Sequence, residues 1–220
     1  MKKMIAFIIT FGYVMILFTG CSNDKQSFAE KSYEAEGTKI EEINIDVRDR
    51  QIEVSLSADH QIHIKYAESE KEYYDISVSK DNVLSMTAIE NKGWLDYIGR
   101  KPELENRKIF LQIPDSFIAS VKVSTTNADI KLSALNVTED LTLSSNGGNI
   151  SFEKINAGSS IAFKVKNGNI TGSILGGYDD YAIACKTKKG NSNLPTEKES
   201  GSKTLSVNAN NGDVEIVFCQ

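Results

Sequence analysis

A repeat of about 20 residues in the second half of the chain constrains the fold more than any other feature. Each unit contains a strand-like segment, a tight turn and a second strand-like segment. The five turns that align occupy residues 127–130, 147–150, 167–170, 189–192 and 211–214, so their last residues are 20, 20, 22 and 22 positions apart. Short units that recur at this spacing bury their apolar faces by stacking on one another. The sequence therefore predicts a β-solenoid.

Turn-forming residues occupy the two central positions of these turns. The second position is held by Ala128, Gly148, Gly168, Gly190 and Gly212. The third position is held by Asp129, Asn149, Asn169, Asn191 and Asp213. Glycine, asparagine and aspartate tolerate the backbone conformations of tight turns. We interpret the third position as a structural turn ladder, whose side chains bond the backbone. A ladder of Ca²⁺ sites is the alternative, because carboxylates and amides also bind that ion.

Apolar residues flank the turns in columns. Seven positions before the end of each turn stand Val123, Leu143, Phe163, Cys185 and Val207. Polar residues alternate with these columns, which indicates strands with one buried face. Cys185 is expected in the core beside Leu143 and Phe163, as a small buried hydrophobe. A disulfide between Cys185 and Cys219 is therefore disfavoured, although an exported protein could form one.

Weaker copies of the pattern extend toward the N-terminus. Residues 43–56 are interpreted as a diverged coil, residues 74–86 as another coil in poorer register, and residues 109–113 as a further strand. We predict an all-β fold over residues 39–220: a β-solenoid, or β-helix-like stack, of coils of about 20–22 residues with a diverged N-terminal part.

Residues 89–107 fit no coil and are interpreted as an insertion. They include Trp94, the single tryptophan of the chain, and Tyr97. Insertions in solenoids often carry function, and exposed aromatic rings can stack on sugars or peptides. Trp94 and Tyr97 are therefore the speculative binding residues. A cap over one end of the solenoid is the alternative role.

The N-terminus has the layout of a secretory signal. Two lysines precede an apolar run over residues 5–18, and small residues follow. Residues 17–21 (Leu-Phe-Thr-Gly-Cys) resemble the lipobox of bacterial lipoproteins, although Phe18 stands where leucine is usual. The resemblance implies cleavage after a signal peptide over residues 1–20, and lipidation of Cys21. We expect residues 21–38 to form a flexible tether. The protein would then be anchored to the cell membrane on its extracytoplasmic face.

The repeated turns also carry a family resemblance. The Asn-Gly-Asn and Asn-Gly-Asp turns, the Phe-Leu-Gln-Ile-Pro segment at 110–114 and the closing strand over 214–218 resemble the bacterial putative-adhesin domain, a β-strand-repeat family. Its members are envelope or secreted proteins, most without a known activity. The resemblance implies a non-enzymatic binding, adhesion or scaffold role, with an envelope protein or a cell-wall or host glycan as partner. It supplies no catalytic residues.

Charge and motifs favour the same class. Removal of residues 1–20 would take the formal charge from −5 to −7, which argues against a nucleic-acid partner. His60 and His63 are the only histidines, and they are interpreted as solvated loop residues rather than metal ligands. We expect no cofactor, metal or catalytic site.

Two other functions remain open. The acidic clusters around residues 68–75, 103–105 and 179–180 could serve an enzyme that acts on polysaccharides through paired carboxylates. The apolar final strand over 214–218 lacks a polar cap, and it could support self-association. The oligomeric state is left open.

Overall fold

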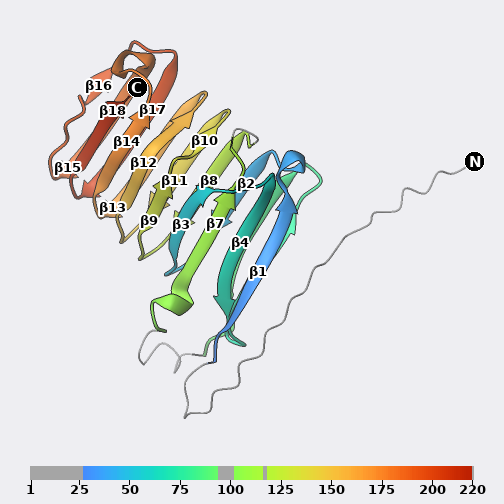
Figure 1. Cartoon of the computed structure of the whole chain (residues 1–220). Coiled ribbons are helices and arrows are strands. Elements are labelled where there is room, and N and C mark those ends of the chain that lie inside the picture. The colour runs from blue at the N-terminus through green and yellow to red at the C-terminus, as the bar shows by residue number, and fades with distance from the viewer. Residues whose placement is uncertain (1–26, 94–101, 116–117, 220) are drawn as a thin grey trace, which may run out of the picture.

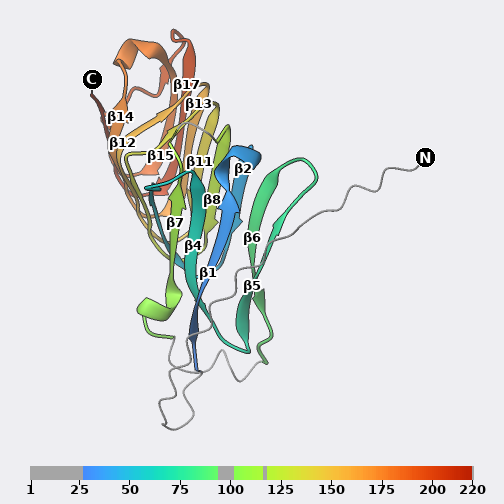
Figure 2. The same ribbon diagram turned by 45° about the vertical axis from the view of Figure 1, so that its right-hand side comes forward.

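Two nine-stranded sheets face each other along the molecule, and successive coils of chain pass from one sheet to the other (Figure 1 and Figure 2). The computed structural model describes residues 27–93, 102–115 and 118–219. Most neighbouring strands along the middle of both sheets run parallel, as stacked coils require. The predicted all-β solenoid is confirmed.

The strands of each sheet follow a spatial order that differs from their order in the chain. Across the first sheet the order is β1 (Ala29–Glu36), β4 (Gln61–Glu68), β7 (Lys108–Ile113), β3 (Gln51–Leu56), β9 (Ile130–Ser133), β12 (Ile150–Ala157), β14 (Ile170–Leu175) and β18 (Val214–Cys219), with β10 (Asn136–Val137) paired to β12. Across the second sheet it is β16 (Glu197–Lys198), β15 (Tyr181–Lys189), β17 (Lys203–Asn211), β13 (Ser160–Asn167), β11 (Asp140–Ser145), β8 (Ser120–Thr125), β2 (Glu42–Asp46), β6 (Val83–Glu90) and β5 (Glu72–Val78).

Helical structure in the described residues is confined to single turns. These are the 3-10 segments η1 (Gly37–Lys39), η3 (Glu105–Arg107) and η4 (Tyr178–Asp180). Within these ranges, no helix has the length and apolar character needed to cross a membrane.

The core lies between the two sheets because the parallel register keeps the apolar columns in phase. Phe152 of β12 and Phe163 of β13 stack across the core, with ring centroids 4.6 Å apart. Gly172, which interrupts one apolar column, lies opposite Phe152. A Cβ on Gly172 would come within 2.5 Å of the Phe152 ring. The glycine therefore makes room for the large neighbouring side chain.

The coils do not stack in sequence order at the C-terminal end. β17 pairs with β13 on one side and with β15 on the other, so the last coil lies inside the one that precedes it in the chain. Cys185 is buried as expected, but its neighbour is Val207 and not Phe163. The expected order of this column is wrong because β17 separates β13 from β15. Cys185 and Cys219 are both free thiols.

The N-terminal end shows the same interleaving and departs further from the prediction. β2 lies between β6 and β8, and β3 lies between β7 and β9. β5 and β6 form an antiparallel hairpin within one sheet, so the coil predicted over residues 74–86 is wrong. The predicted insertion begins later than residue 89, since β6 continues to Glu90.

The prediction of a flexible tether over residues 21–38 is wrong from residue 29 onward. β1 pairs with β4 in antiparallel register along its whole length, and η1 follows it. The folded part of the described chain thus starts at Ala29 rather than at residue 39. β1 supplies the outermost strand of the first sheet at this end, as Figure 1 shows.

Candidate functional site

The five third-position turn residues come together as a ladder along one ridge of the solenoid. The backbone N–H of Asn149 donates to Oδ1 of Asp129 at 2.8 Å, and that of Asn169 donates to Oδ1 of Asn149 at 2.9 Å. The next rungs are Asp213, whose N–H donates to Asn169 at 2.9 Å, and Asn191, whose N–H donates to Asp213 at 2.7 Å. The ladder thus follows the interleaved order of the coils. Its side chains bond the backbone, as the turn interpretation requires.

Glycine is needed beside the ladder because the coils approach closely. A Cβ on Gly148 would lie 2.0 Å from the carbonyl oxygen of Ala128, and one on Gly168 would lie 2.2 Å from that of Gly148. A Cβ on Gly212 would lie 2.0 Å from the carbonyl oxygen of Gly168, and one on Gly190 would lie 2.1 Å from that of Gly212. No side chain fits at such distances, so this column fixes the spacing of the coils.

A buried ionic cluster takes the place of glycine at the N-terminal end. Arg50 holds the position of the glycine column in the first turn, and it is only 4% exposed. Its Nε donates to the Tyr74 hydroxyl at 2.6 Å, and its guanidinium forms an ion pair with Glu72, which is 2% exposed. Nζ of Lys92 lies 2.9 Å from the other carboxylate oxygen of Glu72. We call Arg50, Glu72, Tyr74 and Lys92 the ionic cluster.

The cluster sets the protonation of its members. Burial alone would raise the pKa of Glu72, but hydrogen bonds and charge from Lys92 and Arg50 outweigh it and hold the pKa below its usual value. Burial raises the pKa of Tyr74. Glu72 is therefore a charged carboxylate fixed between two cations. A carboxylate held in this way serves structure and is not free to act as a general acid.

No local pattern in the sequence reveals the ionic cluster. The sequence places Glu72 in the acidic cluster around residues 68–75, whereas its side chain is buried and points inward from β5. The alternation of Glu72, Tyr74 and Ile76 is the available signal, because it places the glutamate on the same face as two apolar side chains. Its two cationic partners are distant in sequence, and no local pattern joins them.

Other carboxylates of the three acidic clusters also have local partners. Glu68 forms an ion pair with Lys31 of β1 at 2.6 Å, and Glu105 forms one with Lys108 at 2.7 Å. Asp180 accepts a hydrogen bond from the N–H of Gly177 at 2.7 Å. These carboxylates are spread over both ends of the molecule, so they do not converge on one site.

His63 lies on β4 between two carboxylates. Its Nε2 is 3.0 Å from Oδ1 of Asp59, and its Nδ1 is 3.4 Å from Oε1 of Glu34 on β1. The N–H of Gln61, together with His63 and Ser57, lowers the pKa of Asp59 to about 2.

His60 is an exposed residue between β3 and β4, as expected, but the expectation of a solvated loop residue is wrong for His63, which lies within β4 and contacts Glu34 of β1. The described residues contain no group of three His, Cys, Asp or Glu side chains that could hold a metal ion.

The aromatic pairs divide between core and surface. Tyr74 belongs to the ionic cluster, whereas Tyr73 is exposed. Tyr181 is fully buried against Phe218, and burial raises its pKa to about 12. Tyr178 is 43% exposed and packs edge-to-face on Phe218. Trp94, Tyr97 and Cys21 lie outside the described residues.

The edge of the final strand is partly covered by its own chain. Asn193 donates from Nδ2 to the carbonyl of Ile216 at 2.8 Å, and its Oδ1 accepts from the N–H of Ile216 at 3.0 Å. The N–H of Asn193 also donates to the carbonyl of Val214. The amide thereby takes the place of a neighbouring strand for the first half of β18. Val217 remains 51% exposed beyond it.

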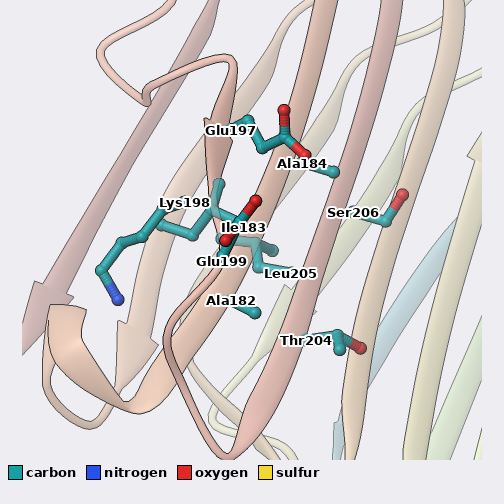
Figure 3. Close-up of a pocket in the computed structure, with 9 residues that line it drawn as sticks. All are labelled: Ala182, Ile183, Ala184, Glu197, Lys198, Glu199, Thr204, Leu205 and Ser206. Carbon is teal, nitrogen blue, oxygen red and sulfur yellow. The ribbon is translucent and has the colours of Figure 1, made fainter.

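A shallow pocket of about 230 Å³ lies beside β16 (Figure 3). Small side chains of β15 and β17 form its floor, and Glu197 and Glu199 stand at its rim. Nζ of Lys198 turns away to bond the carbonyls of Tyr181 and Ser200. The pocket has no buried polar group of the described residues aimed into it, and it resembles a surface depression more than a ligand site.

Known structures share this architecture. A putative cell adhesion protein from Clostridium sporogenes has a TM-score of 0.65 and 14% sequence identity, over 89% of this chain and 100% of its own. A putative adhesin from Bacteroides fragilis has a TM-score of 0.38 and 13% identity, over 88% and 98% of the two chains. One from Parabacteroides distasonis has a TM-score of 0.27 and 16% identity, over 87% and 98%. Only the likeness to the Clostridium protein carries weight, and it concerns the fold alone.

No curated protein matches the chain. A family model does, and it covers residues 40–217, which is nearly the whole folded part. This agrees with the resemblance to a bacterial adhesin-type repeat family that the turns indicate. The chain belongs to the Toastrack DUF4097 family.

Proposed function

We propose that this protein is a lipid-anchored, extracytoplasmic binding protein that holds another envelope component on the outer face of its sheets and catalyses no reaction. One observation carries the proposal: the described residues form two broad, continuous sheets, and each acidic cluster has at least one carboxylate engaged in a local or structural contact. The ladder and the close stacking of coils make these faces rigid. A rigid surface limits the entropy lost on binding.

The likeness to a putative cell adhesion protein favours a binding role over a catalytic one. The Leu-Phe-Thr-Gly-Cys segment at 17–21 supports the anchor, since two acyl chains on Cys21 would hold the protein stably where a single chain gives only marginal binding. The membrane, through this anchor, and an envelope protein or cell-wall or host glycan are thus the proposed partners.

Lipidation is tested by growing cells that express the full chain with a clickable fatty acid. We expect label on the wild type and none on Cys21→Ala, which should also leave the membrane fraction. Label on both variants, or a Cys21→Ala variant retained in the membrane, would contradict the anchor.

Binding is tested by cross-linking in whole cells, followed by mass spectrometry of the products. We expect a reproducible envelope component attached to residues of one outer sheet face. A purified chain that cleaves cell-wall polysaccharide would instead establish the enzymatic alternative.

A further inference from the structure

Charge is divided between the two halves of the second sheet. The adjacent strands β13, β17 and β15 carry six lysines and no acidic residue: Lys164, Lys166, Lys186, Lys188, Lys189 and Lys203. The adjacent strands β5, β6 and β2 carry five acidic residues and no lysine or arginine: Glu42, Asp46, Glu72, Asp75 and Glu90. A chain with more acidic than basic residues has thus gathered lysines at one end of one sheet.

Four of these lysines form two rows on the outer face. Lys164 and Lys186 both lie in register with Asn208, so the amide sits between them. Two residues further along, Lys166 and Lys188 flank Asn210 in the same way. Strand spacing places the lysines of a row about 10 Å apart, and the two rows about 7 Å apart. We call Lys164, Lys166, Lys186 and Lys188 the lysine quartet.

Nothing in the described fold uses the charge of the quartet. All four side chains are exposed, and none forms an ion pair with a described residue. Glu197 of β16 lies opposite Ala184, two residues before Lys186 on β15, and no ion pair of the described residues joins it to the quartet. Lysines on edge strands can prevent unwanted pairing, but β13 is the fourth strand from the edge. Like charges held this close repel one another, so an anionic ligand would stabilise the face.

The chemistry of the face favours a polymer with repeated anions over a protein. Lysine is depleted at protein interfaces, which use aromatic anchors that this face lacks among its described residues. Lysine binds phosphate as a point charge, and the intervening amides can donate further hydrogen bonds. The distances between these lysines exceed the size of one phosphate. These distances match a polymer that carries several phosphate groups.

We propose that the lysine quartet, with Asn208 and Asn210, binds an anionic cell-wall polymer that carries repeated phosphate groups. This inference rests on the proposed envelope function and names the ligand class. A wall polymer is favoured over anionic lipid by the position of the face. β1, the first described strand after the proposed lipidation site, lies at the opposite end of the molecule (Figure 1).

The test measures binding of the full chain, in nonionic detergent, to synthetic poly(glycerol phosphate) at about 50 and about 200 mM salt. Each lysine near an anionic surface contributes about a fivefold gain in affinity. We therefore expect Lys164→Gln/Lys186→Gln to weaken binding about 25-fold and Lys164→Arg/Lys186→Arg to retain it. Wild-type affinity should fall steeply with salt, because binding releases counterions.

The matched control is Lys65→Gln/Lys131→Gln, which removes two exposed lysines from the outer face of the first sheet. It makes the same change in net charge and should leave affinity unchanged. Thermal unfolding checks that every variant is folded. Equal losses in both double variants, or no polymer binding by the wild type at the lower salt concentration, would overturn the inference.

Vesicles of phosphatidylglycerol and phosphatidylcholine supply the competing source of phosphate. Binding to vesicles in the absence of binding to the polymer would overturn the choice of ligand. If the polymer does not bind but cross-linking in cells still captures an envelope component, the proposed function stands and this inference fails. If neither binds, both fail.

Discussion

The N-terminal end of the molecule, from β1 to β7, and the coils from β8 onward share the same two sheets but differ in what holds their turns. In the coils, backbone spacing and a ladder of amide and carboxylate oxygens repeat from turn to turn. At the N-terminal end, a buried arginine with its ionic cluster stands where the glycine would be. A repeated unit can rely on its neighbours for each contact. The coil of β2 and β3 has strand neighbours on both sides, but β6 and β7 are separated by residues 91–107 rather than joined by a matching tight turn. The side chains of the ionic cluster satisfy one another at this place.

The largest expected effect of a substitution concerns the ionic cluster. Arg50→Ala leaves Glu72 buried with one cation fewer, and we expect a loss of about 3–5 kcal/mol in the free energy of unfolding. Urea denaturation measures it. Arg50→Met with Glu72→Leu should recover much of the loss, because it removes both members of the buried pair and leaves Lys92 with Glu90 at 3.9 Å.

The control for this prediction is Lys39→Ala. It breaks an ion pair with Glu36 whose two side chains are 74% and 54% exposed. Such an exposed pair contributes little to stability, because water and salt screen its charges. Equal losses from Arg50→Ala and Lys39→Ala would show that the N-terminal end does not depend on its buried charges.

The second effect tests coil spacing. Gly168→Ala places a Cβ against the carbonyl of Gly148 at a residue whose φ is +156°, and we expect destabilisation of about 2–3 kcal/mol. Gly177→Ala is the matched control, because its Cβ would meet Asp180 at an ordinary 3.4 Å. Thermal or urea unfolding compares the two. A Gly168→Ala protein as stable as the control would remove close stacking as the reason for the glycine column.

The third effect tests one hydrogen bond of the turn ladder, the bond from the N–H of Asp213 to Asn169. Asn169→Ala removes the oxygen that accepts from the N–H of Asp213, and a typical hydrogen bond contributes about 1 kcal/mol. Asp213→Asn keeps an acceptor for Asn191 and should be nearly neutral. The same denaturation measurement distinguishes them. Equal losses would show that the charge of Asp213 contributes as much as the hydrogen bond from Asp213 to Asn169, and no loss from Asn169→Ala would show that this hydrogen bond does not stabilise the ladder.

The smallest effect is on pH dependence. The folded pKa of Glu72 lies below its value of 4.5 in the unfolded chain. Its contribution to stability is therefore present above about pH 4.5 and is lost as the pH falls through the folded pKa. Glu72→Gln should flatten the acid limb of a plot of stability against pH, whatever its effect at neutral pH. An unchanged slope would assign acid sensitivity to other carboxylates.

The same contrast explains how much the sequence can predict. The turns from Asp129 to Asp213 repeat a local pattern, so that pattern predicts their strands, core columns and ladder positions. It does not predict the order of the last two coils, because Leu205 and Ile183 satisfy the same column equally well. The ionic cluster joins three segments that only the folded chain brings together. β1 resembles a tether in sequence because its exposed, charged residues lack a clear alternation.

The interleaved position of β17 and β18 has a consequence for how the protein is made. A ribosome or an export channel delivers β15 before β17, yet β15 has no neighbour among the coils until β17 has paired with β13. Growth by simple addition of coils therefore stops at β14, and the C-terminal end closes only after residues 203–219 have emerged. Pairings 44 residues apart make that step slow. A chain that ends before residue 203 would leave β15 paired only with the two residues of β16, and proteases cleave such exposed segments readily.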